Sequence, residues 1–462
     1  MANASLQAIA QRGVLIPTYD RSKLEPRIVH IGVGGFHRAH MALYTDDVVA
    51  AGSNWGIRGL GLLPGDEAMA AALGPQNHLY SLTERGSESS TTRVIGSIVD
   101  FVVDSTDSGA ARRALADPLT AILSLTITES GYSEPNEASP RTTFDVIATC
   151  LEARRLACGG PITILSCDNL PGNGDVARQA MNAAAARHSA QLHDWVSASC
   201  SFPNSMVDRI TPAVGDTDRQ WLIDELGIDD RWPVIAEPFK QWVVEDQFVA
   251  GRPPWERAGV LFADDVHAWE LYKLRLLNAG HSSIAYLSAL AGIVHVDEAM
   301  ATVEVRTYLE DFLHTEALPT LTEIPGHPRE GYIAMVLGRF ASRGIRDQIA
   351  RLCIDGTAKF PTFLVPTIMR QLELGGPVQR SALALAGWAR YLATVPASQQ
   401  AFDASGDATR ALARESIDEP LRFLELTGVF PESLRWNDRF REAFDDAARR
   451  LAHEGALRAM MS

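Results

Sequence analysis

The sequence lacks the features that mark a nucleic-acid-binding or membrane protein. Lysine and arginine together number 42 against 57 aspartates and glutamates, which leaves a formal net charge of -15 at pH 7. DNA, RNA and anionic lipid all require a basic surface, so none of them is expected as a partner. No apolar run reaches the roughly eighteen residues of a membrane span, and residues 1–17 lack the pattern of a signal peptide. A small molecule is the partner that remains.

Cysteine is scarce and zinc-binding patterns are missing. The five cysteines are odd in number and contain no C-x-x-C pair; they are Cys150, Cys158, Cys167, Cys200 and Cys353. Such thiols suit a reducing compartment, and we expect a cytoplasmic protein. No H-E-x-x-H motif or cluster of zinc-type ligands occurs in the sequence, so no metal is expected.

The length and the order of predicted elements indicate two domains. At 462 residues the chain exceeds one ordinary core. In the first half, short β-rich runs alternate with helical ones, which predicts a parallel sheet covered by helices. The predicted strands are Ile28–Gly32, Gly56–Leu62, Ala121–Thr128 and Ile162–Ser166. We therefore predict an α/β, Rossmann-type dinucleotide-binding domain over residues 1–260.

Beyond Trp255 the β signal fades, and amphipathic helical patterns follow one another. The predicted helices are Trp269–Leu290, Glu298–Leu313, Ile345–Leu352, Thr367–Leu374, Ser381–Ala393 and Arg439–Ala456. We predict a predominantly α-helical, substrate-binding and catalytic domain over residues 261–462.

A glycine-rich loop follows the first strand. A Gly-x-Gly turn between a β-branched run and the start of a helix is typical of the cradle that holds a dinucleotide pyrophosphate. The residues assigned to cofactor binding are Ile31, Gly32, Val33, Gly34, Gly35, Phe36 and His37. His37 stands where the usual fingerprint has its third glycine, and a plain strand-to-helix turn is the alternative. His37 and His40 have the spacing of a metal pair, but a structural role in fixing the loop is favoured.

Two carboxylates are further candidates for the cofactor site. Asp66 follows the second strand, where Rossmann folds place the acid that binds the ribose hydroxyls. No basic residue between Gly59 and Gly74 could receive a 2′-phosphate, which favours NAD over NADP. Glu129 follows the third predicted strand; it either contacts cofactor or substrate or has a buried hydrogen-bonding role.

The segment from Lys273 to His281 is unusually polar for an apolar helix. At about 100° per residue, Glu270, Lys273 and His281 fall within about 80° of arc, and Asn278 lies about 60° beyond His281. Three such polar groups would be costly on a core-facing helix unless they faced a ligand. The alternative without a functional role is that Glu270 and Lys273 form a solvated i,i+3 ion pair.

Alcohol oxidation requires a base for the hydroxyl proton. The sequence offers no catalytic zinc, and its one Tyr-x-x-x-Lys match, Tyr19 to Lys23, precedes the glycine loop. Lys273 remains as the base, with its pKa lowered by desolvation and by a nearby nicotinamide ring.

Polar residues around this lysine can assist the same reaction. Asn169 and Asn278 can donate hydrogen bonds to the developing alkoxide. His281 can orient the substrate oxygen, and Glu270 can pass the proton toward solvent. Residues of both predicted domains are thus expected to act on one substrate.

These motifs resemble those of the mannitol dehydrogenase family, the polyol-specific long-chain dehydrogenases. The resemblance covers nearly the whole chain from Pro17, and the family motifs occur in order at residues 32–40, 126–129, 166–174, 202–212 and 273–281. It implies metal-independent, NAD(P)-linked interconversion of a sugar alcohol and a ketose. The family's catalytic lysine falls on Lys273, its assisting asparagines on Asn169 and Asn278, and its substrate-site histidine on His281.

The resemblance also implies two substrate-binding residues. Asp208 matches the family's substrate-side aspartate, with a helix cap or a structural salt bridge as its alternative. Arg351 is assigned from a looser match, with a surface arginine as its alternative.

The expected substrate is mannitol, arabinitol, sorbitol or a similar open-chain alcohol. A hexuronate reductase acting on fructuronate or tagaturonate is the alternative within the superfamily, and its carboxylate substrate should recruit an extra cation near the reacting carbon. A non-catalytic nucleotide-binding protein is a third hypothesis, which the presence of all four polar site residues disfavours. A monomer or small homo-oligomer is expected.

Overall fold

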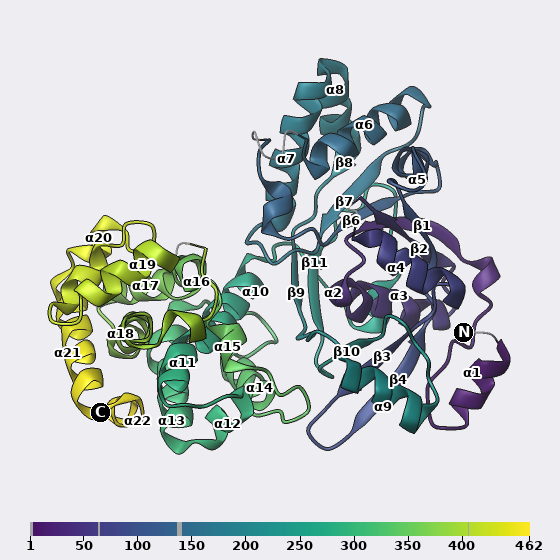
Figure 1. Cartoon of the computed structure of the whole chain (residues 1–462). Coiled ribbons are helices and arrows are strands. Elements are labelled where there is room, and N and C mark those ends of the chain that lie inside the picture. Colours follow the sequence, from purple (N-terminus) through teal and green to yellow (C-terminus); the bar gives the residue numbers. More distant parts are fainter. Residues whose placement is uncertain (1–2, 63–64, 136–140, 405) are drawn as a thin grey trace. The chain divides into compact units, whose positions relative to one another are not determined.

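A computed structural model describes residues 3–62, 65–135, 141–404 and 406–462. The chain divides into two compact units, unit 1 (Met1–His267) and unit 2 (Ala268–Ser462), coloured along the chain in Figure 1. Unit 1 extends beyond residue 260 because strand β12 (Leu261–Ala263) pairs in parallel with β11 (Gln241–Glu245).

Unit 1 is built on a six-stranded sheet whose strands all run parallel, in the order β5-β2-β1-β6-β7-β8. The strands are β1 (Glu25–Ile31), β2 (Trp55–Gly61), β5 (Ile98–Val103), β6 (Ile122–Leu125), β7 (Ile162–Ser166) and β8 (Cys200–Ser201). This is the Rossmann strand order, in which successive strands are added on one side of β1 and then, from β6, on its other side. The predicted fold class is confirmed, and a strand lies at each of the four predicted places, although β6 covers only Ile122–Leu125 of the predicted Ala121–Thr128.

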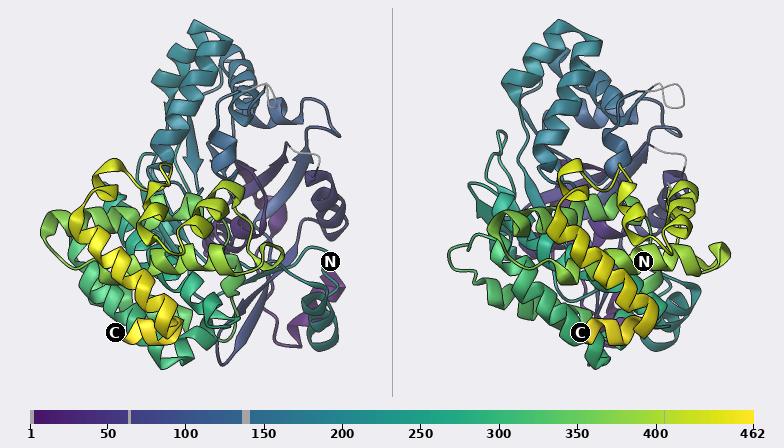
Figure 2. Two further views of the ribbon diagram at one scale, coloured as in Figure 1. Left: turned by 60° about the vertical axis from the view of Figure 1, so that its left-hand side comes forward. Right: turned by 90° about the vertical axis from the view of Figure 1, so that its left-hand side faces the viewer.

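Alternate residues of each central strand serve two separate cores. On β1, Ile28 packs into one cluster with the rings of Tyr44 and Trp242, while Val29 packs into another with Phe144. The second cluster is covered by α5 (Ala110–Ala116), α6 (Thr143–Leu156), α7 (Asn173–His188) and α8 (Ala190–Ser199). Helices α6, α7 and α8 lie side by side in both orientations (Figures 1 and 2).

Two three-stranded sheets that were not predicted complete unit 1. A hairpin of β3 (Tyr80–Arg85) and β4 (Ser90–Ile95) pairs with β10 (Val234–Ala236). Strand β9 (Ser205–Asp208) pairs antiparallel with β11, so that Asp208 lies opposite Gln241. The second of these sheets therefore holds Ser205–Asp208, the middle of the predicted motif 202–212, on a strand, whereas the residues on either side of it are not in a strand.

Every named secondary-structure element in the described residues of unit 2 is a helix. The predicted helices correspond to α17 (Val365–Leu374), α18 (Gln379–Thr394) and α21 (Asp438–Glu454), while residues 298–313 form α12 (Val296–Ala301), α13 (Val303–Asp311) and the start of η6 (Phe312–Ala317). The prediction of a helix from Ile345 was wrong, because Arg346 has a left-handed backbone (φ +48°) and α15 covers only Ile349–Leu352. Within the described ranges, no helix is long and apolar enough to cross a membrane.

The predicted helix Trp269–Leu290 is helical throughout but is not a uniform α-helix. It consists of α10 (His267–Tyr272), a π-helical segment labelled η5 (Lys273–Asn278), and α11 (Ala279–Leu290). Wider π turns inside α-helices are rare and occur often at functional sites. The π segment includes Lys273 and Asn278, while Glu270 lies on α10 and His281 on α11.

Candidate active site

The glycine loop has the shape of a phosphate cradle. Gly32, at the end of β1, has a left-handed backbone (φ +91°), and a Cβ atom there would lie 2.1 Å from the carbonyl oxygen of Thr126. Only glycine fits this position. The hydroxyl of Thr126 donates to the Gly32 carbonyl at 2.6 Å, which fixes the loop to the neighbouring strand end. Helix α2 (Gly35–Ala39) then begins directly after Gly34.

Buried histidines pack against the glycine loop. The His37 ring stacks on His30 with 3.4 Å between ring centroids, and the Nε2 atom of His30 lies 3.1 Å from the Gly32 carbonyl oxygen. His40 pairs with the carbonyl of Gln241 at 2.9 Å. Burial lowers the pKa of His30 and of His40 to about 3, so both rings are neutral at pH 7. His37 and His40 are both buried, with 1% and 0% exposure.

Asp66 lies over the end of β2. It is the first residue of α4 (Asp66–Leu73), and a Cβ atom placed on Gly61 would approach the Asp66 Cβ to 2.6 Å. The carboxylate therefore stands at the carboxyl edge of the second strand, as the sequence predicts for an acid that binds ribose. Leu63 and Pro64, which precede it, lie outside the described residues.

A buried carboxylate that was not predicted joins the ends of β6 and β7. Asp168 accepts hydrogen bonds from the backbone N–H groups of Thr128 (2.7 Å) and Ile127 (3.1 Å) and from the hydroxyl of Tyr132 (2.6 Å). Burial raises the pKa of the Asp168 carboxyl, while these donors oppose that shift. The carboxylate fixes the turn that presents Glu129, which is exposed and begins the short helix Glu129–Tyr132.

Thr128 has a strained backbone in this turn. Its φ of +63° and ψ of 171° lie in a region that is essentially reserved for glycine. Such strain costs about 1–3 kcal/mol and persists only where surrounding contacts hold it. The two backbone hydrogen bonds to Asp168 are contacts of that kind. The turn that positions Glu129 therefore contains a strained residue, Thr128, directly before it.

A second buried side chain connects β7 to β9. The amide of Asn173 donates to the carbonyl oxygens of Asp168 (3.0 Å) and Ser205 (2.8 Å), and its own oxygen accepts from the Ser205 N–H (2.9 Å). Asn169 follows Asp168 and is exposed, while Asp208 ends β9 and is 4% exposed. The network brings three predicted motifs of unit 1 to one region. Asp168 and Asn173 stand inside a predicted motif, but nothing in the sequence shows their partners.

A cavity of about 230 Å³ borders the glycine loop. Gly35, Arg38 and Thr211 contribute to its lining, and the Thr211 hydroxyl oxygen is buried with no hydrogen-bond partner among the described residues. The cavity contains only one of the predicted cofactor residues, Gly35. It lies beside the glycine loop rather than across the strand ends.

In unit 2, the π segment changes the face on which the polar residues lie. In a continuous α-helix, Asn278 would lie about 140° and His281 about 80° around the axis from Lys273. A π segment that holds one extra residue turns all that follows back by about 100°. Asn278 then comes to about 40° from Lys273, and His281 to about 20° on the other side. The π segment therefore gathers the three residues on one face more tightly than the α-helical prediction did.

His281 and Arg351 share a carboxylate neighbour that was not predicted. The His281 ring stacks on Phe340 at 3.9 Å between centroids and nearly parallel planes (5°). Arg351 forms a two-point ion pair with Asp347, with 2.6 Å between Nε and Oδ1. The charges of Arg351 and His281 help to hold the pKa of Asp347 below its usual value, against the effect of burial. Glu270, on the preceding α10, is 7% exposed.

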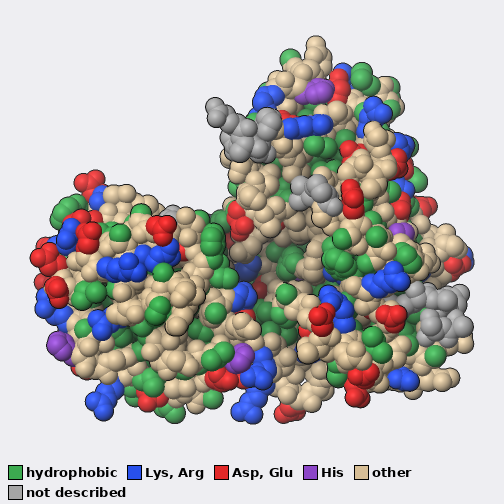
Figure 3. Space-filling view, in the orientation of Figure 1, with side chains coloured by type: hydrophobic (Ala, Val, Ile, Leu, Met, Phe, Trp, Pro, Cys, Tyr) green, Lys and Arg blue, Asp and Glu red, His purple; other side chains and the backbone are tan. Residues whose placement is uncertain are grey.

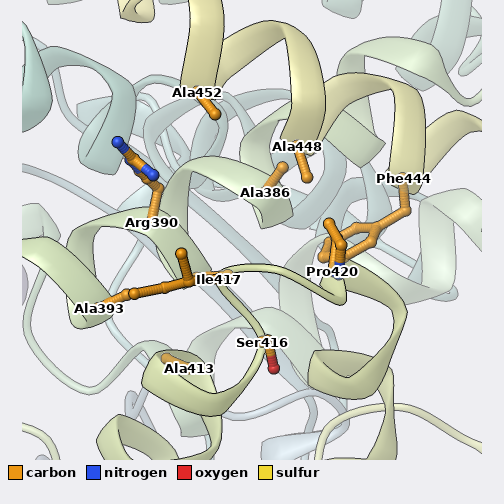
Figure 4. A pocket seen from close by; sticks show the side chains of 11 residues that line it. Ala386, Arg390, Ala393, Ala413, Ser416, Ile417, Pro420, Phe444, Ala448 and Ala452 are labelled. Atoms are coloured by element: carbon orange, nitrogen blue, oxygen red, sulfur yellow. The ribbon is translucent and has the colours of Figure 1, made fainter.

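An apolar cavity elsewhere in unit 2 contains none of the predicted residues. It lies among α18, α21 and α19 (Gly406–Glu415), and small side chains such as Ala386 and Ala448 line it together with Arg390 (Figure 4).

Acidic and basic side chains lie interspersed on the face drawn in Figure 3, without a large basic patch on that face. In the described part of the chain, His, Cys, Asp and Glu form no group of three that could hold a metal ion.

Dehydrogenases that use a nicotinamide cofactor combine a Rossmann sheet and a glycine-rich phosphate loop with polar side chains for the substrate, and this chain has all three features. The family model described as the mannitol dehydrogenase Rossmann domain matches residues 26–257, and the mannitol dehydrogenase C-terminal domain matches residues 265–452. The chain belongs to the mannitol dehydrogenase family, and it is accordingly an oxidoreductase of the polyol dehydrogenase class.

Relatives of known name agree over nearly the whole chain. Mannitol 2-dehydrogenase of Phaeosphaeria nodorum is 38% identical over 96% of this chain and 82% of its own length. Mannitol 2-dehydrogenase of Neosartorya fischeri is 38% identical over 99% of this chain and 97% of its own length. The structure of Pseudomonas fluorescens mannitol 2-dehydrogenase in a ternary complex with NAD and D-mannitol matches with a TM-score of 0.88, 39% identity and 98% coverage of both chains. A substrate-free D-sorbitol dehydrogenase matches with a TM-score of 0.88, 35% identity and 97% coverage of both.

Proposed function

We propose that this enzyme oxidises an open-chain sugar alcohol such as mannitol, arabinitol or sorbitol to the ketose with NAD, and catalyses the reverse reaction, without a metal ion. The observation that carries the proposal is the likeness to the mannitol 2-dehydrogenase complex that contains NAD and D-mannitol. The D-sorbitol dehydrogenase match supports a polyol of this size without selecting one.

The residues of unit 1 fit a dinucleotide. Gly32 leaves room for a pyrophosphate where a Cβ atom would strike the Thr126 backbone, and the Gly34–Phe36 backbone opens α2 beside it. Asp66 at the end of β2 suits the ribose hydroxyls and repels a 2′-phosphate, which supports NAD over NADP. Glu129 at the end of β6 is the second candidate contact. When bound, the nicotinamide would take a hydride from the carbinol carbon of the substrate.

The side chains of this protein handle the proton and the substrate oxygen. We assign Lys273, in its neutral form, to remove the hydroxyl proton. Asn169 and Asn278 donate hydrogen bonds to the oxygen as it becomes an alkoxide and then a carbonyl. Glu270 accepts the proton from Lys273 and releases it toward solvent. The clustering of Lys273 and Asn278 on one face by the π segment supports this assignment.

Three further residues are assigned to substrate binding. His281 donates to the reacting oxygen, while Asp208 and Arg351 bind hydroxyl groups along the polyol chain. The common neighbour Asp347 supports a joint role of His281 and Arg351. We further propose that the enzyme acts in the cytoplasm, which the five free thiols support, and that it is a monomer or small homo-oligomer.

A panel of pentitols and hexitols, assayed at about 340 nm for reduced cofactor with NAD and with NADP, tests the proposal. We expect turnover with at least one polyol and a preference for NAD. The panel includes fructuronate and tagaturonate in the reductive direction. Turnover of a hexuronate alone would replace the proposal with a hexuronate reductase, and no turnover by folded protein that binds NADH would refute the enzymatic assignment.

A further inference from the structure

The ion pair between Arg351 and Asp347 is uneven in its exposure. Both Nε and Nη2 of Arg351 donate to the two oxygens of Asp347, with 2.6 Å for the Nε bond. The arginine side chain is 52% exposed, whereas the carboxylate is 11% exposed. A planar guanidinium bound at two points by one carboxylate has fixed orientation and little affinity left for a second anion.

Backbone contacts hold this pair close to the helix that carries His281. The Val296 N–H donates to the Asp347 carbonyl at 2.9 Å, and the Ile349 N–H donates to the Val294 carbonyl at 2.9 Å. Residues 294–296 lie between α11, which ends at Leu290, and α12, whereas His281 lies in the first turn of α11. The backbone contacts therefore anchor Asp347 to the segment after α11, and the effect of the His281 charge on the pKa of Asp347 shows that the two side chains interact.

Cations and carboxylates alternate around this point. The amine of Lys359 donates to the carbonyl of Leu352 at 3.1 Å, and the side chains that act on it include Arg351, Asp347 and Asp355. Asp347 is one of only two carboxylates named in this group, and it also lies within the field of His281. Removing the charge of Asp347 alone would leave a net positive group with an uncommitted guanidinium.

We propose that Asp347 determines substrate specificity: by occupying the guanidinium of Arg351 beside His281, it selects uncharged polyols and ketoses over sugar acids. The proposal rests on the function proposed above, in which His281 and Arg351 bind substrate. A hydroxyl group needs only a single N–H donor from Arg351. A carboxylate binds best to two N–H groups of the guanidinium at once, and Asp347 already occupies Nε and Nη2 of Arg351.

A second ion pair in unit 2 provides a matched control. On α21, Arg449 donates to Asp445 through Nε (2.7 Å) and Nη2 (3.2 Å), with the same i,i+4 spacing. Here the carboxylate is 29% exposed and the arginine 62% exposed. Asp445→Asn therefore makes the same charge change in a similar pair that has no proposed substrate role.

The test compares D-gluconate, a polyol with a carboxylate, with D-mannitol. Both are titrated calorimetrically into the NADH-loaded enzyme, where no turnover occurs because both partners are reduced. In Asp347→Asn we expect the dissociation constant for gluconate to fall about tenfold, a charge-assisted hydrogen-bond effect, and that for mannitol to change less than about threefold. Asp347→Glu, which keeps the charge, and Asp445→Asn should keep the wild-type ratio. The gain should shrink with added salt.

Equal weakening of gluconate and mannitol binding in Asp347→Asn would show a merely structural role and overturn the proposal. An unchanged gluconate constant would overturn it as well. The polyol panel separates the two levels of the argument. If the wild-type enzyme turns over polyols but Asp347→Asn gains no gluconate affinity, the specificity role alone fails. If no polyol is turned over yet gluconate affinity rises in Asp347→Asn, the proposed function fails and the role of Asp347 stands.

Discussion

Substitution of Asp168 by asparagine should weaken cofactor binding by releasing the turn that carries Glu129. The change is nearly isosteric, so packing is preserved. The carboxylate accepts one backbone N–H on each oxygen, from Thr128 and from Ile127. An asparagine amide has only one acceptor oxygen, so in either orientation its NH₂ group faces a backbone N–H and at least one hydrogen bond is lost.

The magnitude follows from these contacts. Loss of one charge-assisted hydrogen bond costs about 1.5–3 kcal/mol. Relaxation of the strained Thr128 backbone returns part of about 1–3 kcal/mol, so the free energy of unfolding should fall by only about 1–2 kcal/mol. Cofactor binding must then restore the strained turn. We expect the dissociation constant for NADH to rise roughly tenfold or more, since each 1.4 kcal/mol corresponds to about a factor of ten.

Fluorescence titration with NADH and urea unfolding measure the two quantities. Tyr132→Phe is the matched control, because it removes the Tyr132 hydroxyl donor to Asp168 and leaves both backbone donors in place. It should cost about 1 kcal/mol in stability and change NADH affinity less than about threefold. Wild-type NADH affinity in Asp168→Asn, or equal weakening in Tyr132→Phe, would refute the reasoning.

Three further changes have defined outcomes. Lys273→Ala should lower turnover by at least about a hundredfold with partial rescue by small amines and little change in NADH affinity; near-normal kcat would contradict its role as base. Gly32→Ala should abolish NADH binding, because its Cβ would lie 2.1 Å from a backbone oxygen; retained binding would show that the loop can move. Burial raises the pKa of Glu316 to about 7 from an ordinary value of 4.5. The native state thus keeps a proton that the unfolded chain releases, so the free energy of unfolding should fall as pH rises from about 4.5 to 7, and Glu316→Gln should flatten that slope in urea titrations.

The sheet was predictable where strands are β-branched and end in a glycine or polar turn. β1 and β7 meet both conditions and occur where the sequence places them. The hairpin partner Ser90–Ile95 was not predicted because it is mostly polar and half of it faces solvent. Its place depends on pairing with Tyr80–Arg85 and β10, which no local pattern records.

The sequence indicates the polar side chains of the candidate site, but not the residues that hold them in place. Polar residues on an apolar helix single out Lys273 and His281 from the sequence alone. The contacts of Asp168 involve the backbone of Thr128, which follows another strand, and those of Asp347 involve Arg351, and no local sequence pattern shows either pairing. Ordinary helical spacing of apolar residues continues through 273–278, so the sequence carries no sign of the π segment.

The π segment also bears on how this enzyme would respond to selection for stability. A π turn packs its backbone less favourably than an α turn, so a single-residue deletion within 273–278 should relieve a local cost. Deletion of one residue between Lys273 and Asn278 would leave Asn278 four residues and His281 seven residues after Lys273. A regular α-helix would then hold them at about 40° and about 20° from Lys273, on the face that they occupy with the π segment. Such a deletion should therefore stabilise unit 2 without moving these side chains to another face, so the extra residue is one that the placement of Lys273, Asn278 and His281 does not require.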